Sequence, residues 1–390
     1  MDLNEINSDE FKDLHCTKCS EWLKVDHILF NENVDGVQIL IDKLPMLVCP
    51  NCGETYFPLR TRIQLRGIIE EAKKRGVDTF RGKRNGSTGN EKFDFCKNVN
   101  FDYDSTDYIT IPALYRPFNK GALTPVFFKK EVLQKFGSDP NYTLEQGSNT
   151  YGTIYHPHGY ISYGITRNNK VICWLCDLDE LPEEEQKYFS SFNIPSDHDI
   201  ASEFYAAQIE VQWGSHSNEN QLFENIKLVN KKCKKNFGFE IFKENDPQKL
   251  QDITRPIFWD EKNVQPVVNS LNKTCIESIN QDVLKSDISK KEPDFDLGGL
   301  RGLKLLEKYI SINFPQLNAE QVMKPFYVLY DFRKVLSHDT GSDEEKILKS
   351  CYERMGISPE TGFEGLYDSI VSECGKSLDE IINHESKDKE

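Results

Sequence analysis

The sequence predicts a multidomain α+β protein with an N-terminal zinc ribbon, a central α+β domain and a C-terminal helical bundle. Two cysteine pairs near the N-terminus have metal-site spacing, the middle of the chain alternates strand patterns with turn residues, and the last third has helical periodicity. At 390 residues, the chain can form several domains that each bury a core. The predicted boundaries are 1–60 for the ribbon, 61–92 for a basic helix and linker, 93–265 for the central domain and 266–390 for the bundle.

The composition restricts the class of protein. A net charge of -15 argues against a broad basic surface, so we expect any RNA site to be local. The sequence contains no apolar run of about 18 residues and begins with an acidic segment, so we expect no membrane span and no signal peptide. Eleven cysteines, an odd number, fit a reducing cytoplasm better than a disulfide framework.

The four cysteines near the N-terminus give the most specific pattern in the sequence. Cys16 and Cys19 form one Cys-x2-Cys pair, and Cys49 and Cys52 form a second. Each pair can direct two thiolates from a tight turn toward one ion, and the two pairs together complete a tetrahedral Zn²⁺ site without an open position. We therefore predict a structural zinc ion. Turn residues followed by apolar alternation in 34–41 predict a hairpin between the pairs.

Residues 44–56, Leu-Pro-Met-Leu-Val-Cys-Pro-Asn-Cys-Gly-Glu-Thr-Tyr, resemble the YgiT-type zinc finger at the N-terminus of MqsA-like antitoxins. The match covers about residues 14–60. The resemblance implies a finger that binds a regulatory protein partner; the helix-turn-helix domain that follows it in that family is not recognisable here. The alternative is a ribbon that only stabilises a short N-terminal domain.

A basic connector follows the predicted ribbon. Between Arg60 and Arg84 there are nine basic and three acidic residues in an otherwise acidic chain. Apolar spacing predicts a short helix that ends near Gly76, and 81–90 has the composition of a linker. Nucleic-acid phosphates are attracted to such a segment. The alternative, which we favour here, is a solvated helix with a charged tether.

The central domain is predicted from short patterns. Asn168 and Asn169 tolerate the positive φ of a tight turn and predict a hairpin. The other expected elements are strands at 108–112, 124–128, 159–166 and 170–176, and helices at 130–136, 183–189, 200–211 and 221–235.

Two further groups in this domain resemble metal ligands. Cys173 and Cys176 have Cys-x2-Cys spacing, but Trp174 and Leu175 lie between them, so we predict two metal-free thiols in a buried strand. His156 and His158 precede the predicted hairpin, and an acidic cluster follows it. The members of that cluster are Asp177, Asp179, Asp197, His198, Asp199 and Glu203. These side chains can ligate a divalent ion; the interpretation we favour is that Ser196 or Asp197 caps a helix.

Helical periodicity predicts the C-terminal bundle. The expected helices are 267–284, 300–314, 319–337, 343–355 and 363–384, with a loop at 286–299. Pro325 lies inside the third of these helices and predicts a kink or break there.

The end of the third helix carries the candidate catalytic residues. An apolar stripe consists of Val322, Phe326, Leu329, Phe332 and Leu336. Another face of the helix can then present Arg333. His338 lies five positions later, where turn residues end the helix and the helix dipole favours an imidazolium.

This pair resembles the Arg-x4-6-His motif of HEPN domains, helical bundles found in prokaryotic toxin and antiviral ribonucleases and in catalytically silent relatives. Lys334 departs from the family pattern, which commonly has a small polar residue after the arginine. The resemblance implies metal-independent RNA cleavage, with His338 moving the proton of the ribose hydroxyl and Arg333 stabilising the phosphorane charge. It also implies a homodimer, because each chain supplies half of a composite site.

Two other functions remain open from the sequence. In the first, the chain is a non-catalytic module whose bundle dimerises or contacts a partner, while the ribbon and basic connector bind a protein or a nucleic acid. In the second, a metal-dependent phosphodiesterase uses the central His and Asp residues. Our leading hypothesis is a cytoplasmic ribonuclease of toxin or antiviral defence that is regulated by the ribbon and the central domain. The alternative is that Arg333 and His338 form a solvated helix end and have no catalytic role.

Overall fold

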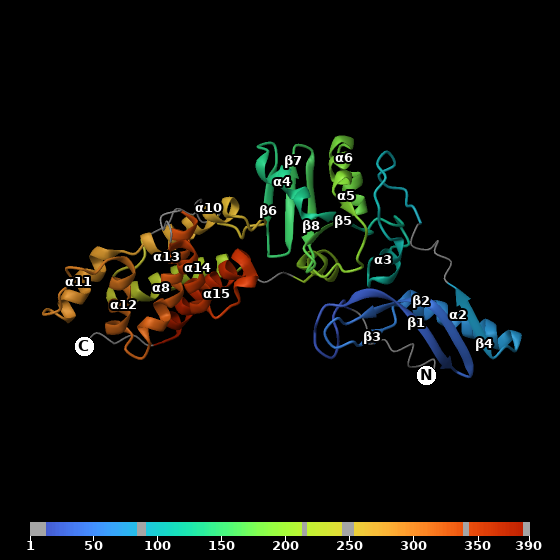
Figure 1. Ribbon diagram of the computed structural model, residues 1–390, viewed down its shortest axis with the longest axis horizontal. Coiled ribbons are helices and arrows are strands. Elements are labelled where there is room, and N and C mark those ends of the chain that lie inside the picture. The colour runs from blue at the N-terminus through green and yellow to red at the C-terminus, as the bar shows by residue number, and fades with distance from the viewer. Residues whose placement is uncertain (1–12, 84–90, 213–216, 244–252, 338–342, 385–390) are drawn as a thin grey trace. The chain divides into compact units, whose positions relative to one another are not determined.

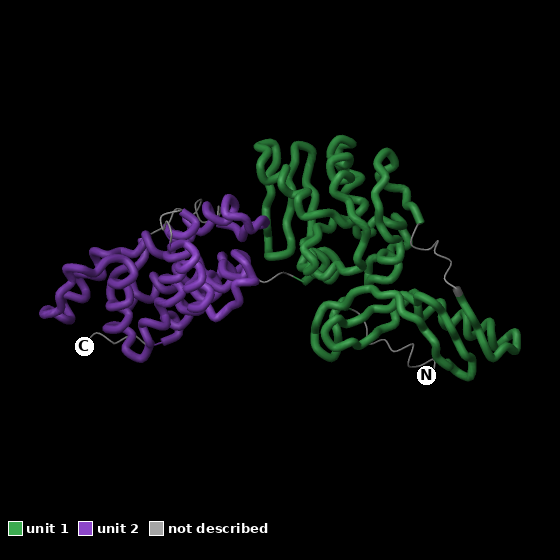
Figure 2. Tube along the Cα trace, in the orientation of Figure 1, with its two compact units in different colours: residues 1–215 green, residues 216–390 purple. Residues whose placement is uncertain are grey.

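The computed structural model describes residues 13–83, 91–212, 217–243, 253–337 and 343–384. The chain forms two compact units, residues 1–215 and 216–390 (Figure 2). It mixes helices and strands, with a sheet and a four-cysteine cluster near the N-terminus and helices toward the C-terminus, which confirms the coarse fold class predicted above. Among the helices described, none is long and apolar enough to cross a membrane.

The N-terminal sheet is built on one long hairpin. Strands β1 (Lys24–Val34) and β2 (Val37–Val48) pair in antiparallel fashion, and β3 (Thr55–Tyr56) adds to β2. The hairpin turns at Asp35 and Gly36, both at positive φ, as expected for a two-residue turn. Strand β4 (Thr79–Lys83) pairs with β2 in parallel.

Helix α2 (Leu59–Arg75) lies against this sheet. Leu65, Ile69 and Ala72 are buried in one cluster with apolar residues of β1 and β2. The predicted helix that ends near Gly76 is confirmed, and Gly76 is left-handed. The predicted linker at 81–90 is wrong for residues 81–83, which belong to β4, and its remaining residues lie outside the described ones.

A six-stranded antiparallel sheet forms the middle of the first unit (green in Figure 1). Its strands, in spatial order, are β10 (Asn193–Ile194), β5 (Pro125–Lys129), β9 (Lys170–Trp174), β8 (Gly159–Ile165), β7 (Tyr151–His156) and β6 (Thr143–Gln146). The predicted hairpin is confirmed, because β8 pairs with β9 and Asn169 adopts a positive φ.

Apart from α2, the helices of the first unit are short. They are α3 (Ser105–Thr110), the 3-10 turn η2 (Lys130–Leu133), α4 (Gln134–Ser138), α5 (Leu175–Asp179), α6 (Glu183–Ser191), α7 (Glu203–Tyr205) and the π-helical turn η3 (Ala206–Glu210). The predicted strand at 108–112 is wrong. Asp104 caps a helix there by accepting a 2.7 Å hydrogen bond from the backbone N of Thr106.

The second unit is helical. Its helices are α8 (Asn218–Phe237), α10 (Glu261–Asn272), the π-helical turn η4 (Lys273–Glu277), α11 (Gln281–Lys291), α12 (Gly302–Asn313), α13 (Ala319–Leu336), α14 (Glu344–Met355), the 3-10 turn η6 (Pro359–Thr361) and α15 (Gly362–Asn383). The single helix predicted at 267–284 is interrupted between η4 and α11. The predicted loop at 286–299 is helical up to Lys291, and Pro325 lies inside the unbroken α13.

The second unit begins at residue 216, whereas the sequence placed the start of the bundle at 266. The difference comes from α8, which packs on α15 and shares its core. Asn225, fully buried on α8, donates a 3.0 Å hydrogen bond to the backbone oxygen of Gly375 on α15. Tyr367 of α15 donates to the buried carboxylate of Glu219 at 2.9 Å.

Candidate metal centre and catalytic residues

The four predicted ligands lie together. The sulfurs of Cys16, Cys19, Cys49 and Cys52 are all within 4.8 Å of one another. The distances Cys16–Cys52 and Cys19–Cys49 are 3.5 Å, and Cys19–Cys52 is 3.7 Å. A tetrahedron of Zn–S bonds has sulfur separations of about 3.8 Å, whereas a disulfide needs about 2.0 Å. The four sulfurs therefore fit one tetrahedral metal ion.

The two cysteine pairs have the same local structure. The backbone N of Cys16 donates to the oxygen of Glu21, and the backbone N of Cys49 donates to that of Glu54, both at 2.8 Å. The residue after the second cysteine of each pair, Ser20 or Gly53, has a positive φ and donates to the oxygen of the first cysteine. Each pair is thus a tight turn that points two sulfurs to one side, and Gly53 supplies this conformation without steric cost.

Tyr56 on β3 lies beside the sulfurs. Its hydroxyl is 3.2 Å from the sulfur of Cys16 and accepts a 3.0 Å hydrogen bond from the backbone N of Thr17. The hydrogen bond with Tyr56 lowers the pKa of the Cys16 thiol to about 6. A thiolate is the form that binds a metal, so Tyr56 favours the binding form of this ligand.

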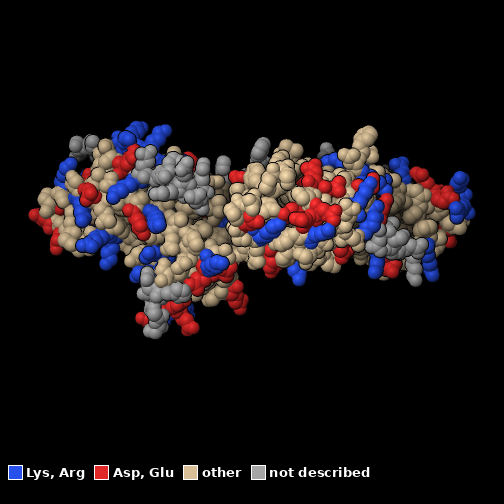
Figure 3. Space-filling model, turned by 90° about the horizontal axis from the view of Figure 1, so that it is seen from above, with Lys and Arg blue, Asp and Glu red and all other residues tan. Residues whose placement is uncertain are grey.

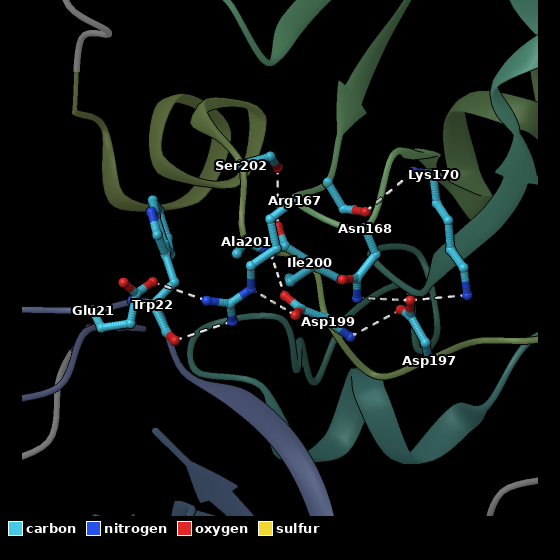
Figure 4. A network of polar contacts seen from close by, with 11 residues as sticks. Glu21, Trp22, Arg167, Asn168, Lys170, Asp197, Asp199, Ile200, Ala201 and Ser202 are labelled. Atoms are coloured by element: carbon cyan, nitrogen blue, oxygen red, sulfur yellow. Dashed lines mark hydrogen bonds and ion pairs between the residues drawn. The ribbon is translucent and has the colours of Figure 1, made fainter. Parts of the chain in front are cut away.

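The segment that follows the first cysteine pair is joined to the central sheet through Glu21 and Trp22 (Figure 4). Arg167, between β8 and β9, donates to Asp199 at 2.7 Å, to Glu21 at 2.9 Å and to the backbone oxygen of Trp22 at 3.0 Å. Cys16 and Cys49 belong to the same buried cluster as central residues such as Trp174 and Tyr205. The predicted ribbon is therefore packed into the first unit and is not an independent module.

Of the two candidate catalytic residues, the structure describes only Arg333. Arg333 lies in the last turn of α13, half-buried, and its Nε donates a 3.3 Å hydrogen bond to Oδ1 of Asn269 on α10. His338 lies outside the described residues. Asn269 is a polar neighbour that helical periodicity did not reveal, because α10 and α13 are brought together only by the fold.

Sequence analysis also missed a buried polar group in the first unit. Asp107 on α3 is fully buried; its Oδ1 lies 2.7 Å from Nδ1 of His198, and its Oδ2 accepts a 2.6 Å hydrogen bond from Ser196. The ring of His27 packs edge-on against that of His198, with centroids 5.1 Å apart. His198 has a positive φ of 64°, which is uncommon for a residue with a side chain.

These contacts correct the interpretation of residues 196–199. The predicted cap at Ser196 or Asp197 is wrong, because α7 begins only at Glu203. Ser196 instead contacts Asp107, and Asp197 accepts hydrogen bonds from Asn168 at 3.0 Å and Lys170 at 2.8 Å.

The second cysteine pair lies at the end of a strand. Cys173 is fully buried in β9 as predicted, but Cys176 lies in α5 and is half-buried, so its predicted place in the strand is wrong. Within the part of the chain that the structure describes, the first four cysteines form the only group of three or more His, Cys, Asp or Glu residues arranged for a metal. His156 and His158 are at the β7–β8 turn, with ring centroids 6.3 Å apart.

No protein-family model matches this chain, and no curated protein or solved structure is detectably similar to it.

Proposed function

We propose that the second unit is a HEPN-like ribonuclease domain that cleaves RNA without a metal ion, in prokaryotic defence or toxin activity. The observation that supports this most directly is the position of Arg333. Arg333 lies in the last turn of α13, which ends at Leu336. In the sequence, only Ser337 separates the end of this helix from His338. The hydrogen bond to Asn269 restricts the guanidinium to one side of α13.

In this proposal, His338 and Arg333 divide the reaction between them. His338 accepts the proton of the ribose 2′-hydroxyl as that oxygen attacks the adjacent phosphate, since an imidazole titrates near neutrality. Arg333 stabilises the additional negative charge of the phosphorane, since a planar guanidinium can contact two phosphate oxygens. The imidazolium of His338 then returns this proton to the leaving 5′-oxygen, and the products are a 2′,3′-cyclic phosphate and a 5′-hydroxyl.

One arginine and one histidine are a sparse catalytic set, so we propose a homodimer. Two copies of the α13 end near a two-fold axis bring two arginines and two histidines to one site. Positive charge concentrated there attracts RNA phosphate despite the acidic chain.

We further propose that the cysteine cluster holds one structural Zn²⁺ and that the N-terminal sheet is a zinc ribbon that binds a regulatory protein partner. Four thiolates leave no open position for a substrate, and this supports a structural ion over a catalytic one. Cysteine thiols without disulfide bonds are consistent with the cytoplasm as the location we propose.

The test of the ribonuclease is cleavage of total cellular RNA by the purified chain in the presence of a chelator. We expect cleavage in wild type, its loss in His338→Ala, and its retention in the matched control Lys334→Ala, which changes the neighbouring cation of α13. Undiminished cleavage in His338→Ala rejects this site.

A binding module without catalysis is the second candidate, favoured by the closed cysteine set and the basic residues of α2. Absence of RNA cleavage by the dimeric wild-type chain, combined with a stable complex between the first unit's ribbon and a protein, would select it. Chelator-sensitive cleavage would instead support the metal-dependent phosphodiesterase.

A further inference from the structure

Two segments of the first unit carry cations and no carboxylate, although acidic residues outnumber basic ones in the chain. Over the face drawn in Figure 3, basic and acidic side chains are interspersed. The first is 59–66 at the start of α2, and the second is 113–120, within the loop 111–121 that follows α3. Their cations are Arg60, Arg62, Arg66, Arg116 and Lys120. Some of these cations have acidic partners elsewhere: Arg66 pairs with Glu70, and Lys120 pairs with Glu91.

The two segments meet through a cation–π contact. The guanidinium carbon of Arg60 lies 3.9 Å from the centre of the Tyr115 ring. Arg60 belongs to α2 and Tyr115 to the loop, so the contact joins a basic helix to an aromatic loop. We call the resulting area the α2–loop surface.

The loop backbone is anchored by buried residues. The hydroxyl of the buried Tyr108 accepts a 2.9 Å hydrogen bond from the backbone N of Arg116 and donates a 2.8 Å hydrogen bond to the oxygen of the same residue. Leu114 is fully buried. The loop ends at Gly121, whose φ is +91° and where an added Cβ would lie 2.1 Å from the Phe93 side chain.

This rigid loop exposes an aromatic side chain. Phe118 is 83% exposed, and Tyr115 is 37% exposed. On α2, Leu59 and Ile63 are 65% and 54% exposed. Apolar side chains presented to water by an anchored backbone are typical of an interaction site, since a core position would bury them.

We propose that the α2–loop surface binds single-stranded RNA, with Phe118 stacking on a base and Arg60 and Arg116 facing phosphates. Single-stranded nucleic-acid sites combine backbone-tracking cations with aromatic faces, and both are present in these two segments, neither of which contains a carboxylate of its own. We infer RNA and not DNA as the ligand because the ribonuclease proposed above acts on RNA. The preference for RNA therefore rests on the proposed function. The surface then captures the strand that the second unit cleaves.

Charge complementarity favours this occupant over a protein. An acidic protein would also meet the cations, but it would leave Phe118 without the flat partner that a nucleobase supplies. A duplex hides its base faces and offers phosphates alone, so the aromatic residues would add nothing to its binding.

The test measures binding separately from cleavage. A fluorescein-labelled oligouridylate of about 12 nucleotides, within the usual site size of such surfaces, is titrated with the full-length His338→Ala chain while anisotropy is followed. The matching single-stranded DNA and an RNA duplex of equal length are titrated in parallel. We expect saturable binding of the single-stranded RNA and weaker binding of the other two.

Single substitutions then assign the surface. Phe118→Ala should weaken binding about tenfold, the loss of one stacked base. Tyr160→Ala is its matched control, because Tyr160 is 64% exposed on the central sheet away from both segments. Arg60→Ala should lower the slope of log K against log salt by about 0.7, whereas Arg75→Ala at the other end of α2 should leave it unchanged. Thermal unfolding of each variant checks that the exposed substitutions preserve the fold.

The outcomes separate this inference from the ribonuclease. No binding by the His338→Ala chain, equal loss in Phe118→Ala and Tyr160→Ala, or equal affinity for the single-stranded DNA overturns the inference. Cleavage by wild type without binding at this surface leaves the ribonuclease standing, and binding without any cleavage leaves the inference standing while rejecting the ribonuclease.

Discussion

The fully buried carboxylate of Asp107 lies 2.7 Å from Nδ1 of His198. Burial disfavours the imidazolium of His198, but the hydrogen bond and the negative charge of Asp107 outweigh burial, and they raise the pKa of His198. Burial is also the largest influence on Asp107 and raises the pKa of its carboxyl against the hydrogen bond from His198. The folded protein therefore holds protons at this pair more tightly than the unfolded chain does.

The first prediction follows from that binding of protons. Because the pKa of His198 is higher in the folded protein, protonation of His198 stabilises the fold. This stabilisation is fully present below pH 6.5, the ordinary pKa of histidine, and it is lost as the pH rises through the folded-state pKa. His198→Gln should therefore lower the free energy of unfolding by about 1 to 3 kcal/mol at pH 6 and by less at pH 9.

Urea unfolding of wild type and His198→Gln across this pH range measures the difference. Asp104 and Asp197 also raise the pKa of His198, and a charged His27 would oppose them, so His27→Gln is included as a comparison. A cost of His198→Gln that grows with pH would contradict the assigned direction.

The second prediction concerns the metal. We expect one zinc ion per chain, lost in Cys49→Ser and in Cys52→Ser but retained in Cys176→Ser, whose thiol is outside the cluster. Mass spectrometry under native conditions and metal analysis measure the stoichiometry.

Because Cys16 and Cys49 belong to a core cluster shared with the central sheet, loss of the ion should also destabilise that sheet. Hydrogen exchange should show faster exchange in β5 and β9 as well as in β1 and β2. Faster exchange confined to the N-terminal sheet would mean that the two parts are not energetically coupled.

The third prediction tests the contacts of Arg167, between β8 and β9, with Asp199, Glu21 and the backbone oxygen of Trp22. Arg167→Ala leaves the carboxylate of Asp199, 4% exposed, without its cation. Since Arg167 itself is 28% exposed, solvent screens part of the interaction, and we expect a loss of about 1 to 3 kcal/mol in the free energy of unfolding. Lys187→Ala removes an exposed, solvent-screened ion pair with Glu183 and should leave the free energy of unfolding essentially unchanged. Chemical denaturation of both variants gives the comparison.

The sequence was most informative where local chemistry decides structure. Two Cys-x2-Cys pairs predicted the cluster, because each pair closes its own turn, and Asn168-Asn169 predicted the β8–β9 hairpin. Local pattern failed at residues 108–112, where the run Tyr-Ile-Thr-Ile consists of residue types that are common in strands, but the Asp104 cap begins a helix. It also failed for Ser196, because its partner Asp107 is 89 residues away along the chain. The contact of Arg333 with Asn269 is equally non-local, so sequence analysis could name the arginine but not the residue that positions it.

The last prediction uses this contact to test the catalytic proposal. In the proposed reaction Arg333 stabilises the phosphorane, so Arg333→Ala should raise the barrier by about 2 to 4 kcal/mol. Asn269 acts only through Arg333, and Asn269→Ala should therefore cost less, about 1 kcal/mol, which is the usual contribution of one hydrogen bond. Adding Asn269→Ala to Arg333→Ala should cost nothing further, because the residue that Asn269 positions is already gone. Single-turnover cleavage of a labelled RNA by wild type, both single variants and the double variant gives the four rates. Additive losses would show that Asn269 acts independently of Arg333, and equal rates in all four chains would remove Arg333 from the catalytic site.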